Sequence, residues 1–544
     1  MKKLISILLL LVLVIASTLM LDSCFFNFNT VRELGQLKFE LRVDGYYVSA
    51  AGYSDDRKKI TEVEIPDTYL GEPVVGIDWF YGCENLTSIS IPDSVKKIDF
   101  WAFYGCKSLT SIDLPDSVEY IGDSAFYGCT ALTSITIPDS VETIGEYAFA
   151  SCTSLTSIDI PDGVKDIGYG AFRDCTALTS ITIPDSVETI GEKAFTACTS
   201  LTSIDIPDGV KSIGGGAFWD CTALTSITIP DSVETIGEKA FAACTSLTSI
   251  DIPDGVKSIG DGAFWDCTAL SEVNLGDSIV SIGKRGFYHC TALTKIDLPS
   301  GVKSIGDYAF AHCYELAEID LGESLETIGK DAFRQCYVLP EIGLPSSLRS
   351  IGDYAFCCCY AITEAALPDS LTELGKFAFA DCTSLRRIDL GNSIACIEAG
   401  VFDTCYALTE IEIPSSVESI GFHAFFDCTS LSSIVVPDSV ESISRGAFAS
   451  CPALESITLP FVGGRADSAD GSFRYPFGYI FGTTEYEGSL AVEQAYYGRS
   501  STETTTETFY IPASLRSVTV TGGEIPQGAF MNCDSIGNIE LPDA

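Results

Sequence analysis

Apolar residues recur along this chain with a period of 23 residues, and the period is kept from Cys83 to Cys451. Counted from each cysteine, the repeat reads C-x-x-L-x-x-I-x-I-P-x-x-V-x-x-I-G-x-x-A-F-x-x. Its I-x-I part alternates between apolar and polar positions, which predicts a short strand with one buried face. A fixed period of this length is typical of a solenoid, in which each repeat adds a strand to a parallel sheet. We therefore expect a repeat solenoid of about 19–20 stacked repeats, with short return strands or turns between the sheet strands.

The inner apolar positions of the repeat predict a continuous core. No single repeat can bury its own Leu, Ile, Val and Phe side chains, so the stability must come from stacking. The phenylalanine position, which runs from Phe80 to Phe448, is expected to form a spine of stacked rings. Within one repeat, the Pro-Asp-Ser segment 138–140 supplies a corner after the strand, and Gly145 is expected to permit a tighter bend.

The cysteines at the first position of the repeat are expected to be buried free thiols. Neighbouring repeats place the Cα atoms of this column about 5 Å apart, which is within the range of a disulfide. An unbroken column of equivalent thiols cannot pair completely, however, and a packed inner column favours a small apolar residue. Cys357 and Cys358 stand beside the column residue Cys359, and Cys396 stands outside the column. We expect no metal site at these additional cysteines.

Two polar columns are expected on the surface of the stack. At the position 13 residues after the cysteine, Glu and Lys alternate, as in Glu188 and Lys211. This alternation favours stacking by about 0.2–1 kcal/mol per pair. Between the two isoleucines of the strand, Asp159, Asp205 and Asp251 alternate with threonines. These aspartates predict an acidic face that binds cations or basic protein surfaces, and the alternative is a solvated face without a ligand.

The two ends of the chain depart from the repeat. Within residues 24–60, two short apolar stretches flank Asp44-Gly45, which predicts a β-hairpin that caps the solenoid. Residues 61–460 hold the repeats, with a small corner insertion at 68–73, and residues 511–544 hold the terminal repeats. Residues 461–510 form an aromatic-rich insertion, which we interpret as a local packing device or as a recognition loop. Its candidate ligand-binding residues are Tyr475, Tyr479, Tyr486, Tyr496 and Tyr497.

Composition excludes several classes of function. The net charge of −43 repels the phosphates of nucleic acids, so we expect no nucleic-acid partner. The chain has 3 histidines and none of the motifs of serine hydrolases, nucleotide-binding proteins or zinc proteases, so we expect no enzyme and no cofactor. His289 and His312 occupy the same position of neighbouring repeats and are spaced to share a metal. We expect them to be exposed and unligated, because no third ligand is evident.

Residues 1–23 are expected to be a signal peptide. Lys2 and Lys3 precede the apolar segment 4–20, which is typical of an export signal. The segment 21–24, Leu-Asp-Ser-Cys, resembles the lipobox of bacterial lipoproteins, which implies that Cys24 becomes the lipidated first residue of the mature protein. The alternative is an uncleaved apolar helix. Both interpretations place the remainder of the chain outside the cytoplasm.

The consensus L-T-S-I-x-I-P-D-S-V-x-x-I-G-x-x-A-F-x-x-C resembles the BspA-like (Treponema-type) leucine-rich repeat family, over about residues 60–460 and 510–544. The resemblance implies a leucine-rich repeat protein at the bacterial cell surface or outer membrane, and some relatives are adhesins for host matrix proteins or other bacteria. We therefore expect a lipid-anchored protein that contacts an extracellular or host protein. The alternatives are a passive spacer of the cell envelope and a glycan-binding module that uses the tyrosine-rich insertion.

Overall fold

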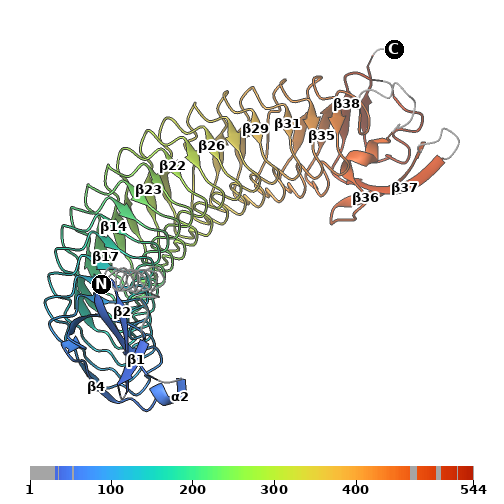
Figure 1. Cartoon of the computed structure of the whole chain (residues 1–544). Helices are drawn as coiled ribbons and strands as arrows, with labels where there is room; N and C mark the ends of the chain where they lie inside the picture. The colour runs from blue at the N-terminus through green and yellow to red at the C-terminus, as the bar shows by residue number, and fades with distance from the viewer. Residues whose placement is uncertain are drawn as a thin grey trace, which may run out of the picture. The chain divides into compact units, whose positions relative to one another are not determined.

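A computed structural model describes residues 31–34, 36–51, 54–465, 475–497, 504–523 and 525–542. The chain divides into two compact units, Met1–Ser186 and Val187–Ala544, and within each unit the repeats stack in chain order (Figure 1). The expected signal peptide and the lipidation site Cys24 lie outside the described residues. Within the described ranges, no helix has the length and apolar character needed to cross a bilayer.

The first unit begins with the expected hairpin. β2 (Leu37–Arg42) and β3 (Gly45–Ala50) are antiparallel and are joined by the two-residue turn that contains Asp44. β1 (Val31–Leu34) lies antiparallel to the other side of β2. β3 in turn runs parallel to β6 (Glu72–Ile77), which belongs to the first repeat. The predicted β-hairpin cap is therefore confirmed.

Two small elements join this cap to the repeats. α2 (Ser54–Arg57) is a single helical turn after the hairpin. β5 (Thr68–Tyr69) is antiparallel to the start of β6, so the segment predicted as a corner insertion folds as a second, smaller hairpin. The Tyr69 ring stacks on the fully buried ring of Phe39 in the cap, with the centroids 4.0 Å apart. The corner insertion thereby packs against the cap.

The repeats of both units place short parallel strands in two ladders. The strand predicted from the I-x-I pattern belongs to the first ladder, and a strand that ends just before the repeat glycine belongs to the second. In the first unit, the first ladder consists of β4 (Glu62–Glu64), β7 (Ser88–Ser90), β11 (Ser157–Asp159) and β13 (Ser180–Thr182). The second ladder of this unit consists of β6, β8 (Lys97–Ile98), β9 (Tyr120–Ile121), β10 (Thr143–Ile144) and β12 (Asp166–Ile167).

The second unit continues the same arrangement over more repeats. Its first ladder consists of β15 (Ser203–Asp205), β17 (Ser226–Thr228), β19 (Ser249–Asp251), β21 (Glu272–Asn274), β23 (Lys295–Asp297), β25 (Glu318–Asp320), β28 (Glu364–Ala366), β30 (Arg387–Asp389), β33 (Ser433–Val435), β35 (Ser456–Leu459), β38 (Ser517–Val520) and β39 (Asn538–Glu540). Its second ladder consists of β14 (Thr189–Ile190), β16 (Ser212–Ile213), β18 (Thr235–Ile236), β20 (Ser258–Ile259), β22 (Ser281–Ile282), β24 (Ser304–Ile305), β26 (Thr327–Ile328), β27 (Ser350–Ile351), β29 (Glu373–Leu374), β31 (Cys396–Ile397), β32 (Ser419–Ile420) and β34 (Ser442–Ile443).

The two ladders differ in continuity. In the second unit, the second ladder pairs strand to strand from β14 to β29, and β31, β32 and β34 form a further parallel sheet. The first ladder is divided into the pairs β15–β17, β19–β21, β23–β25 and β28–β30 before the longer run β33–β35–β38–β39. The predicted parallel-sheet solenoid with short return strands is confirmed, and the return strands form the more continuous sheet.

The phenylalanine and cysteine columns fill the core as expected. The rings of Phe218 and Phe241 are nearly parallel, with the centroids 5.4 Å apart, and both are fully buried. The column cysteines are buried free thiols. The Cys244 Sγ donates a hydrogen bond of 3.2 Å to the carbonyl oxygen of Phe218, the residue whose ring stacks on that of Phe241. Burial raises the pKa of Cys221 to about 12, so this thiol stays protonated at neutral pH.

The repeat glycine lies at the expected bend and has a second role. Gly145 does not adopt the left-handed backbone conformation that favours glycine in many tight bends. A Cβ atom at this position would lie 2.6 Å from the backbone nitrogen of Asp123 in the preceding repeat. The predicted bend is present, since the Ala148 amide donates to the carbonyl oxygen of Gly145 at 3.3 Å, but it does not depend on a left-handed glycine. Gly145 also allows the backbones of neighbouring repeats to approach closely, although Glu398 and Ser444 hold the same position in other repeats.

The left-handed residues occupy two other positions of the repeat. They lie five residues and one residue before the column cysteine, for example Lys239 with φ 55° and Ala243 with φ 57°. The Lys239 amide donates to the carbonyl oxygen of Asp261 at 2.9 Å, and the Ala243 amide donates to that of Trp265 at 2.6 Å. Non-glycine residues rarely adopt this conformation. Hydrogen bonds to the next repeat hold it here, whatever the side chain is.

The alternating charged column forms ion pairs at the positions expected. The Lys211 Nζ lies 3.2 Å from a Glu188 carboxylate oxygen, and the Lys96 Nζ lies 3.1 Å from one of Glu119. These side chains are more than half exposed, between 54% and 62%. Exposed pairs of this kind contribute about 0–1 kcal/mol each. The column therefore supports stacking only weakly in comparison with the core.

The aromatic-rich insertion leaves the first ladder and returns to it. Ser456 of β35 pairs directly with Ser517 of β38. Between these strands lie the 3-10 helix η1 (Phe477–Phe481) and the antiparallel hairpin of β36 (Ser489–Tyr497) and β37 (Thr504–Pro512). Figure 1 shows this hairpin at the C-terminal end of the second unit.

A buried glutamine attaches the insertion to the terminal repeat. The Gln494 side chain is fully buried, and its Oε1 accepts a hydrogen bond of 2.8 Å from the backbone nitrogen of Gly478. Its Nε2 donates to the carbonyl oxygens of Ala529 and Met531, both at 3.1 Å. One amide group therefore connects η1, β36 and the last repeat, which fixes the insertion on the end of the stack.

Candidate functional site

The first-ladder strands present the predicted aspartates to solvent. In β19, Ser249 and Asp251 are exposed and Ile250 is buried, and β11 and β15 expose Asp159 and Asp205 in the same way. The alternation arises because successive side chains of a strand point to opposite faces of the sheet.

The structure does not bring these aspartates into direct contact with one another. Asp205 is paired with Thr228 on the neighbouring strand, and Asp251 is paired with Asn274. The Asn274 side-chain amide donates a hydrogen bond of 2.7 Å to the Asp251 carboxylate. Asp159 belongs to the first unit, whereas Asp205 and Asp251 belong to the second. The three aspartates are separate exposed residues on a polar strand face and do not form one site.

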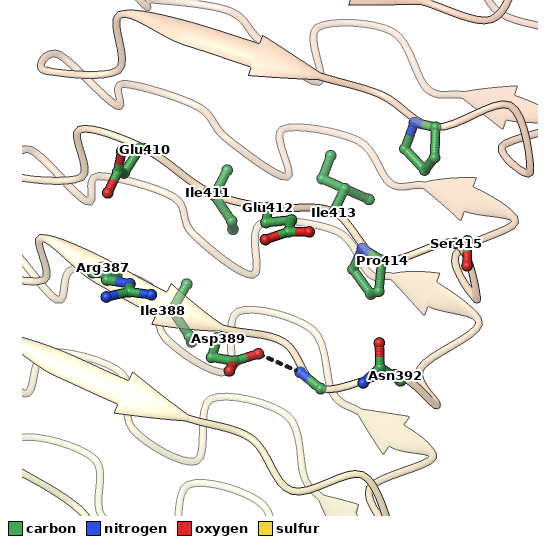
Figure 2. Close-up of a pocket in the computed structure, with 12 residues that line it drawn as sticks. Arg387, Ile388, Asp389, Asn392, Glu410, Ile411, Glu412, Ile413, Pro414 and Ser415 are labelled. Carbon is green, nitrogen blue, oxygen red and sulfur yellow. Dashed lines mark hydrogen bonds between the residues drawn. The ribbon is translucent and has the colours of Figure 1, made fainter.

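A groove opens along the first ladder where the ladder is interrupted (Figure 2). It encloses about 740 Å³. Its wall includes Arg387, Asp389 and Asn392 from one repeat and Glu410 and Glu412 from the next. The repeats separate on this face, where the hydrogen bond from the Thr409 amide to the carbonyl oxygen of Arg386 is long, at 3.4 Å.

The groove carries more negative than positive charge. Arg387 stands against the three carboxylates of Asp389, Glu410 and Glu412. The Asp389 carboxylate already accepts a hydrogen bond of 3.0 Å from the backbone nitrogen of Gly391, drawn as a dashed line in Figure 2. The remaining acceptors suit a basic side chain of a protein partner. No sequence argument pointed to this groove, because the interruption of the ladder is a matter of hydrogen-bond lengths between repeats.

A group of exposed aromatic side chains lies in the first unit, and we call it the aromatic surface. It consists of Trp79, Tyr81, Phe100, Trp101, Tyr104 and Tyr127. Four of these residues are exposed, namely Trp79 at 45%, Tyr81 at 49%, Phe100 at 42% and Trp101 at 47%. Such exposure of neighbouring large apolar side chains is unusual on a protein surface and is typical of interaction sites.

The members of the aromatic surface form two connected rows. Tyr81, Tyr104 and Tyr127 occupy the same position of three consecutive repeats, and their ring centroids are 5.1 Å and 4.7 Å apart. The Trp79 and Trp101 centroids are 6.5 Å apart. The position two residues before the column cysteine thus carries a ladder of rings on the outside, parallel to the buried phenylalanine spine.

Sequence reasoning missed the aromatic surface, although a signal was present. The regular aromatic column of the repeat is the phenylalanine column, which is buried in every described repeat from Phe80 to Phe448. Tyrosine at 81, 104 and 127 falls on a position that elsewhere holds residues as different as Ala242 and Arg173. Aromatic residues at consecutive variable positions of a repeat are the pattern that would have predicted this surface.

The tyrosines of the insertion are only partly available to a ligand. Tyr475 and Tyr479 stack on each other, with the ring centroids 4.0 Å apart, and both are half-buried. Burial raises the pKa of Tyr479 and that of the half-buried Tyr486. Tyr496 and Tyr497 lie at the end of β36, and their side chains are outside the described part of the structure.

Packing accounts for the apolar residues of η1. Phe477, Ile480 and Phe481 are fully buried. The alternation of aromatic residues in this segment therefore belongs to a short helix that packs on the terminal repeat, and no strand is formed there.

The two histidines of neighbouring repeats lie edge to face, with the ring centroids 6.2 Å apart, and their Nδ1 atoms have different partners. The His289 Nδ1 lies 2.5 Å from a carboxylate oxygen of Asp266, and the His312 Nδ1 lies 3.2 Å from the Tyr314 hydroxyl. Both rings are half-buried, which differs from the exposed state expected. Burial lowers the pKa of His312, so this ring is neutral at physiological pH. In the described residues, neither histidine belongs to a group of three close metal-ligating side chains.

Comparison with known proteins identifies the repeat. The chain matches the family described as BspA type leucine rich repeat region (6 copies), over residues 73–201, 165–290, 234–363 and 349–464. These matches span more than half of the chain, so the protein belongs to the BspA-type leucine-rich repeat family. The resemblance expected from the consensus is thereby confirmed.

Several solved structures are similar to this chain. A leucine-rich repeat protein from Bacteroides ovatus is 25% identical with a TM-score of 0.42, over 79% of this chain and 94% of that chain. A leucine rich cell surface protein from Faecalibacterium prausnitzii is 24% identical with a TM-score of 0.34, over 84% of this chain and 99% of that chain. The pneumococcal vaccine antigen PcpA is 19% identical with a TM-score of 0.34, over 79% of this chain and 93% of that chain. No curated protein matches the chain.

Proposed function

We propose that this protein is an exported bacterial surface protein that binds an extracellular protein, as an adhesin for host matrix proteins or for other cells. The aromatic surface of the first unit is the observation that carries the proposal. Family membership supports it, because leucine-rich repeat solenoids typically act as scaffolds for protein interaction and not as enzymes.

The composition of the aromatic surface suits a protein partner. Tyrosine and tryptophan are enriched in protein interfaces because each buries a large apolar area at a small cost in side-chain entropy. Trp101 is held at φ 58° by a backbone hydrogen bond of 3.0 Å from its amide to the carbonyl oxygen of Asp123. The backbone that carries the ring is therefore ordered before the partner binds, which lowers the entropic cost of association.

The acidic strand face is assigned a supporting role in the same proposal. Asp205 and Asp251 are exposed, and the groove at Asp389 and Glu412 adds further carboxylates. With a net charge of −43, the protein attracts basic surfaces over a distance of about one Debye length. This charge raises the rate of association more than the final affinity.

The proposal includes a lipid anchor at Cys24. The negative charge of the chain opposes adsorption to anionic headgroups, so retention at the membrane requires a covalent anchor or an uncleaved segment. Acylation contributes about 0.8 kcal/mol per buried CH₂ group. The test is mass analysis of the protein isolated from membranes: an acylated cysteine at the first mature position supports the anchor, and an intact residue 1–23 segment contradicts it.

The binding experiment uses the purified chain on immobilised matrix glycoproteins and on whole cells. Trp101→Lys and Tyr104→Ala remove rings and introduce residues that the same repeat positions hold elsewhere, at Lys193 and Ala150. We expect the double variant to bind at least about tenfold more weakly, since interface aromatics contribute about 2 kcal/mol or more when they are central. Trp219→Ala is the matched control, because Trp219 is 38% exposed and lies in the other unit.

Three further results decide between the alternatives. Equal binding by the double variant and the control would remove the aromatic surface from the proposal. If binding is lost only at high salt, the binding site would be assigned to the acidic strand face. The variants Asp205→Asn and Asp251→Asn would then be tested. Deletion of residues 461–510 tests the glycan-binding alternative. The deletion leaves β35 and β38, which pair directly on either side of the insertion. Absence of saturable binding to any surface would favour the passive spacer.

A further inference from the structure

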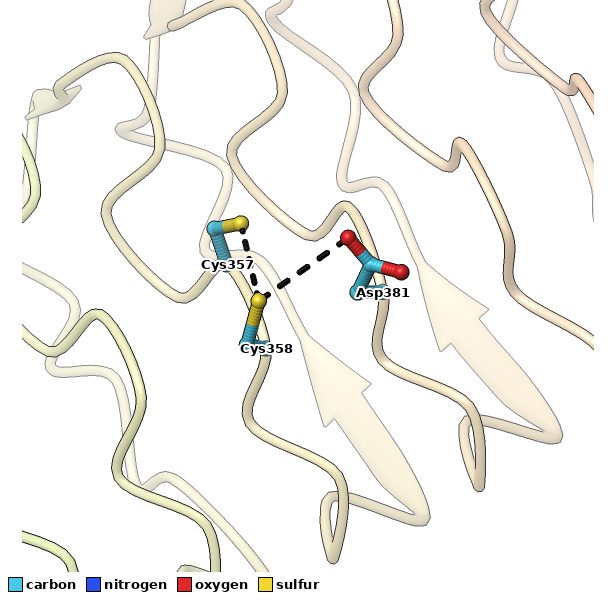
Figure 3. Close-up of side chains that lie close together, drawn as sticks. All are labelled: Cys357, Cys358 and Asp381. Atoms are coloured by element: carbon cyan, nitrogen blue, oxygen red, sulfur yellow. Dashed lines mark hydrogen bonds between the residues drawn. The ribbon is translucent and has the colours of Figure 1, made fainter.

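A cluster of two thiols and a carboxylate lies in the second unit (Figure 3). The Cys357 and Cys358 Sγ atoms are 3.4 Å apart, and the Cys358 Sγ lies 3.8 Å from a carboxylate oxygen of Asp381. All three ligand atoms lie within 4.8 Å of one another. Over the described ranges of the chain, it is the one group of three metal-ligating side chains this close together.

The stack itself positions the ligand-bearing residues. Cys358 and Asp381 occupy the same left-handed position of consecutive repeats, with φ of 62° and 58°. The Cys358 amide donates to the carbonyl oxygen of Ala380 at 2.9 Å, and the Asp381 amide donates to that of Asp403 at 2.7 Å. These bonds fix the backbone on both sides of the cluster, so the three ligand atoms are held together before any ion binds.

The distances match the coordination geometry of zinc. Zinc binds thiolates at about 2.3 Å and carboxylate oxygens at about 2.0–2.2 Å in a tetrahedral arrangement. Two thiolates on one tetrahedral ion are therefore roughly 3.7 Å apart, and a thiolate and a carboxylate oxygen are roughly 3.5 Å apart. The observed separations of 3.4 Å and 3.8 Å differ from these values by only a few tenths of an ångström.

A bound ion would leave little net charge on the cluster. Two thiolates, one carboxylate and one divalent cation together carry a single negative charge. The Arg334 guanidinium, which is paired with Asp331 at 3.2 Å, adds a positive charge near the two thiols.

We propose that Cys357, Cys358 and Asp381 bind one thiophilic divalent cation of the zinc class, with the fourth coordination position open to water. Cys358 and Asp381 are half-buried and Cys357 is buried at 5% exposure, so an ion has access from solvent on one side only. This site departs from the sequence expectation that the additional cysteines bind no metal. The expectation considered the adjacent cysteines alone, whereas the carboxylate comes from the next repeat.

The experiment measures cation binding by the purified reduced chain. Cd²⁺ and Zn²⁺ are titrated after removal of metal by a chelator, and Cd²⁺ binding is followed by the thiolate-to-metal charge-transfer absorption. We expect one tightly bound cation per chain. Cys357→Ala and Cys358→Ser are expected to abolish the charge-transfer signal, and Asp381→Asn to weaken binding about tenfold or more. Affinity should fall as the pH is lowered, because the thiols must lose their protons.

The variants are chosen so that the fold is kept. The substituting residues already occupy the same positions of other repeats, in Ala380, Ser450 and Asn532. Cys396→Ser and Asp220→Asn are the matched controls, since Cys396 is a half-buried thiol outside the cluster and Asp220 is a left-handed residue of the same column.

Unchanged binding in Cys358→Ser would overturn the proposal, and so would equal loss in the controls. Isolation of the exported protein with a Cys357–Cys358 disulfide, detected as the loss of two hydrogens, would also overturn it.

Discussion

The buried and the exposed columns of the repeat follow different rules within the second unit. The first position of the repeat is cysteine throughout, for instance at 290, 313, 336, 359 and 382. The position just before it holds His289, His312, Gln335, Cys358 and Asp381. All five of these preceding residues share a left-handed backbone, with φ between 58° and 64°. Packing therefore determines which side chain stands at the cysteine position. At the position just before the cysteine, hydrogen bonding between repeats determines only the backbone conformation.

This difference shows how a repeat protein acquires function without losing its fold. The side chain just before the column cysteine can change because the neighbouring repeats hold its left-handed backbone. Cys358 and Asp381 of the cysteine-aspartate cluster lie in this column, whereas the tyrosines of the aromatic surface lie one residue earlier, in a column that buries small residues such as Ala242. The acidic residues of the strand face follow the same rule, since Asp159 and Thr182 occupy paired positions of adjacent strands.

The largest expected effect comes from breaking the inner column. Phe241 is fully buried and stacks between Phe218 and Phe264, with both centroid distances 5.4 Å. Phe241→Ala should lower the free energy of unfolding by about 3–5 kcal/mol, measured by chemical denaturation. Trp219→Ala removes a ring that is 38% exposed, at a position that holds alanine in other repeats, and should lower it by less, about 1–2 kcal/mol. Similar losses in the two variants would contradict the division into inner and outer columns.

An intermediate effect is expected from two glycines. A Cβ atom on Gly352 would lie 2.6 Å from the backbone nitrogen of Lys330, whereas a Cβ atom on Gly343 would meet nothing within 4 Å. Gly352→Ala should therefore destabilise the protein by about 1–3 kcal/mol, because neighbouring repeats must move apart. Gly343→Ala should be neutral or stabilise it by up to about 1 kcal/mol, because alanine restricts the unfolded chain. Thermal unfolding of both variants provides the measurement, and effects of the same sign would refute the close-approach role.

The smallest expected effect on stability comes from modifying an outer thiol. Burial raises the pKa of Cys221 to about 12, whereas the hydrogen bond from Cys357 lowers the pKa of Cys358. At pH 8 the thiolate fraction of Cys221 is about 10⁻⁴, and it rises as the pH approaches 12. We expect an alkylating reagent, with chelator present, to label Cys358 in the folded protein and Cys221 only after unfolding. Peptide mass analysis reads out both sites, and labelling of Cys358 should leave the unfolding midpoint unchanged.

Much of the fold could be predicted from the sequence, because the core residues recur at a fixed period. The strand at Ser249–Asp251, the phenylalanine spine and the hairpin around Asp44 all follow from local alternation, column identity or turn chemistry. The role of Gly145 could not be predicted, since it depends on the distance between the backbones of two repeats. The left-handed residues were equally hidden, because Lys239 and Ala243 carry none of the usual composition of a bend.

The candidate sites were less accessible to sequence reasoning for a related reason. The exposed aspartates were predicted correctly as strand residues, but their separation on the strand face is a property of pairing register. The contact of Cys358 with Asp381 joins residues 23 positions apart, so it is visible only when the repeats are read as a lattice. The tyrosines of the insertion share no column, and the contact of Tyr475 with Tyr479 forms within the insertion, which Gln494 attaches to the terminal repeat.

The paired left-handed residues have a consequence for how the chain folds. Each non-glycine residue in this conformation costs about 1 kcal/mol, and an isolated repeat has no neighbour whose carbonyl groups compensate for that cost. Lys239 and Ala243, for example, receive their acceptors from the following repeat. Nucleation, in which the first repeats become ordered, is therefore unfavourable in free energy, whereas each later repeat packs on one that is already folded. We expect folding to propagate from a few initial repeats to their neighbours, and the free energy of unfolding to rise with the number of folded repeats.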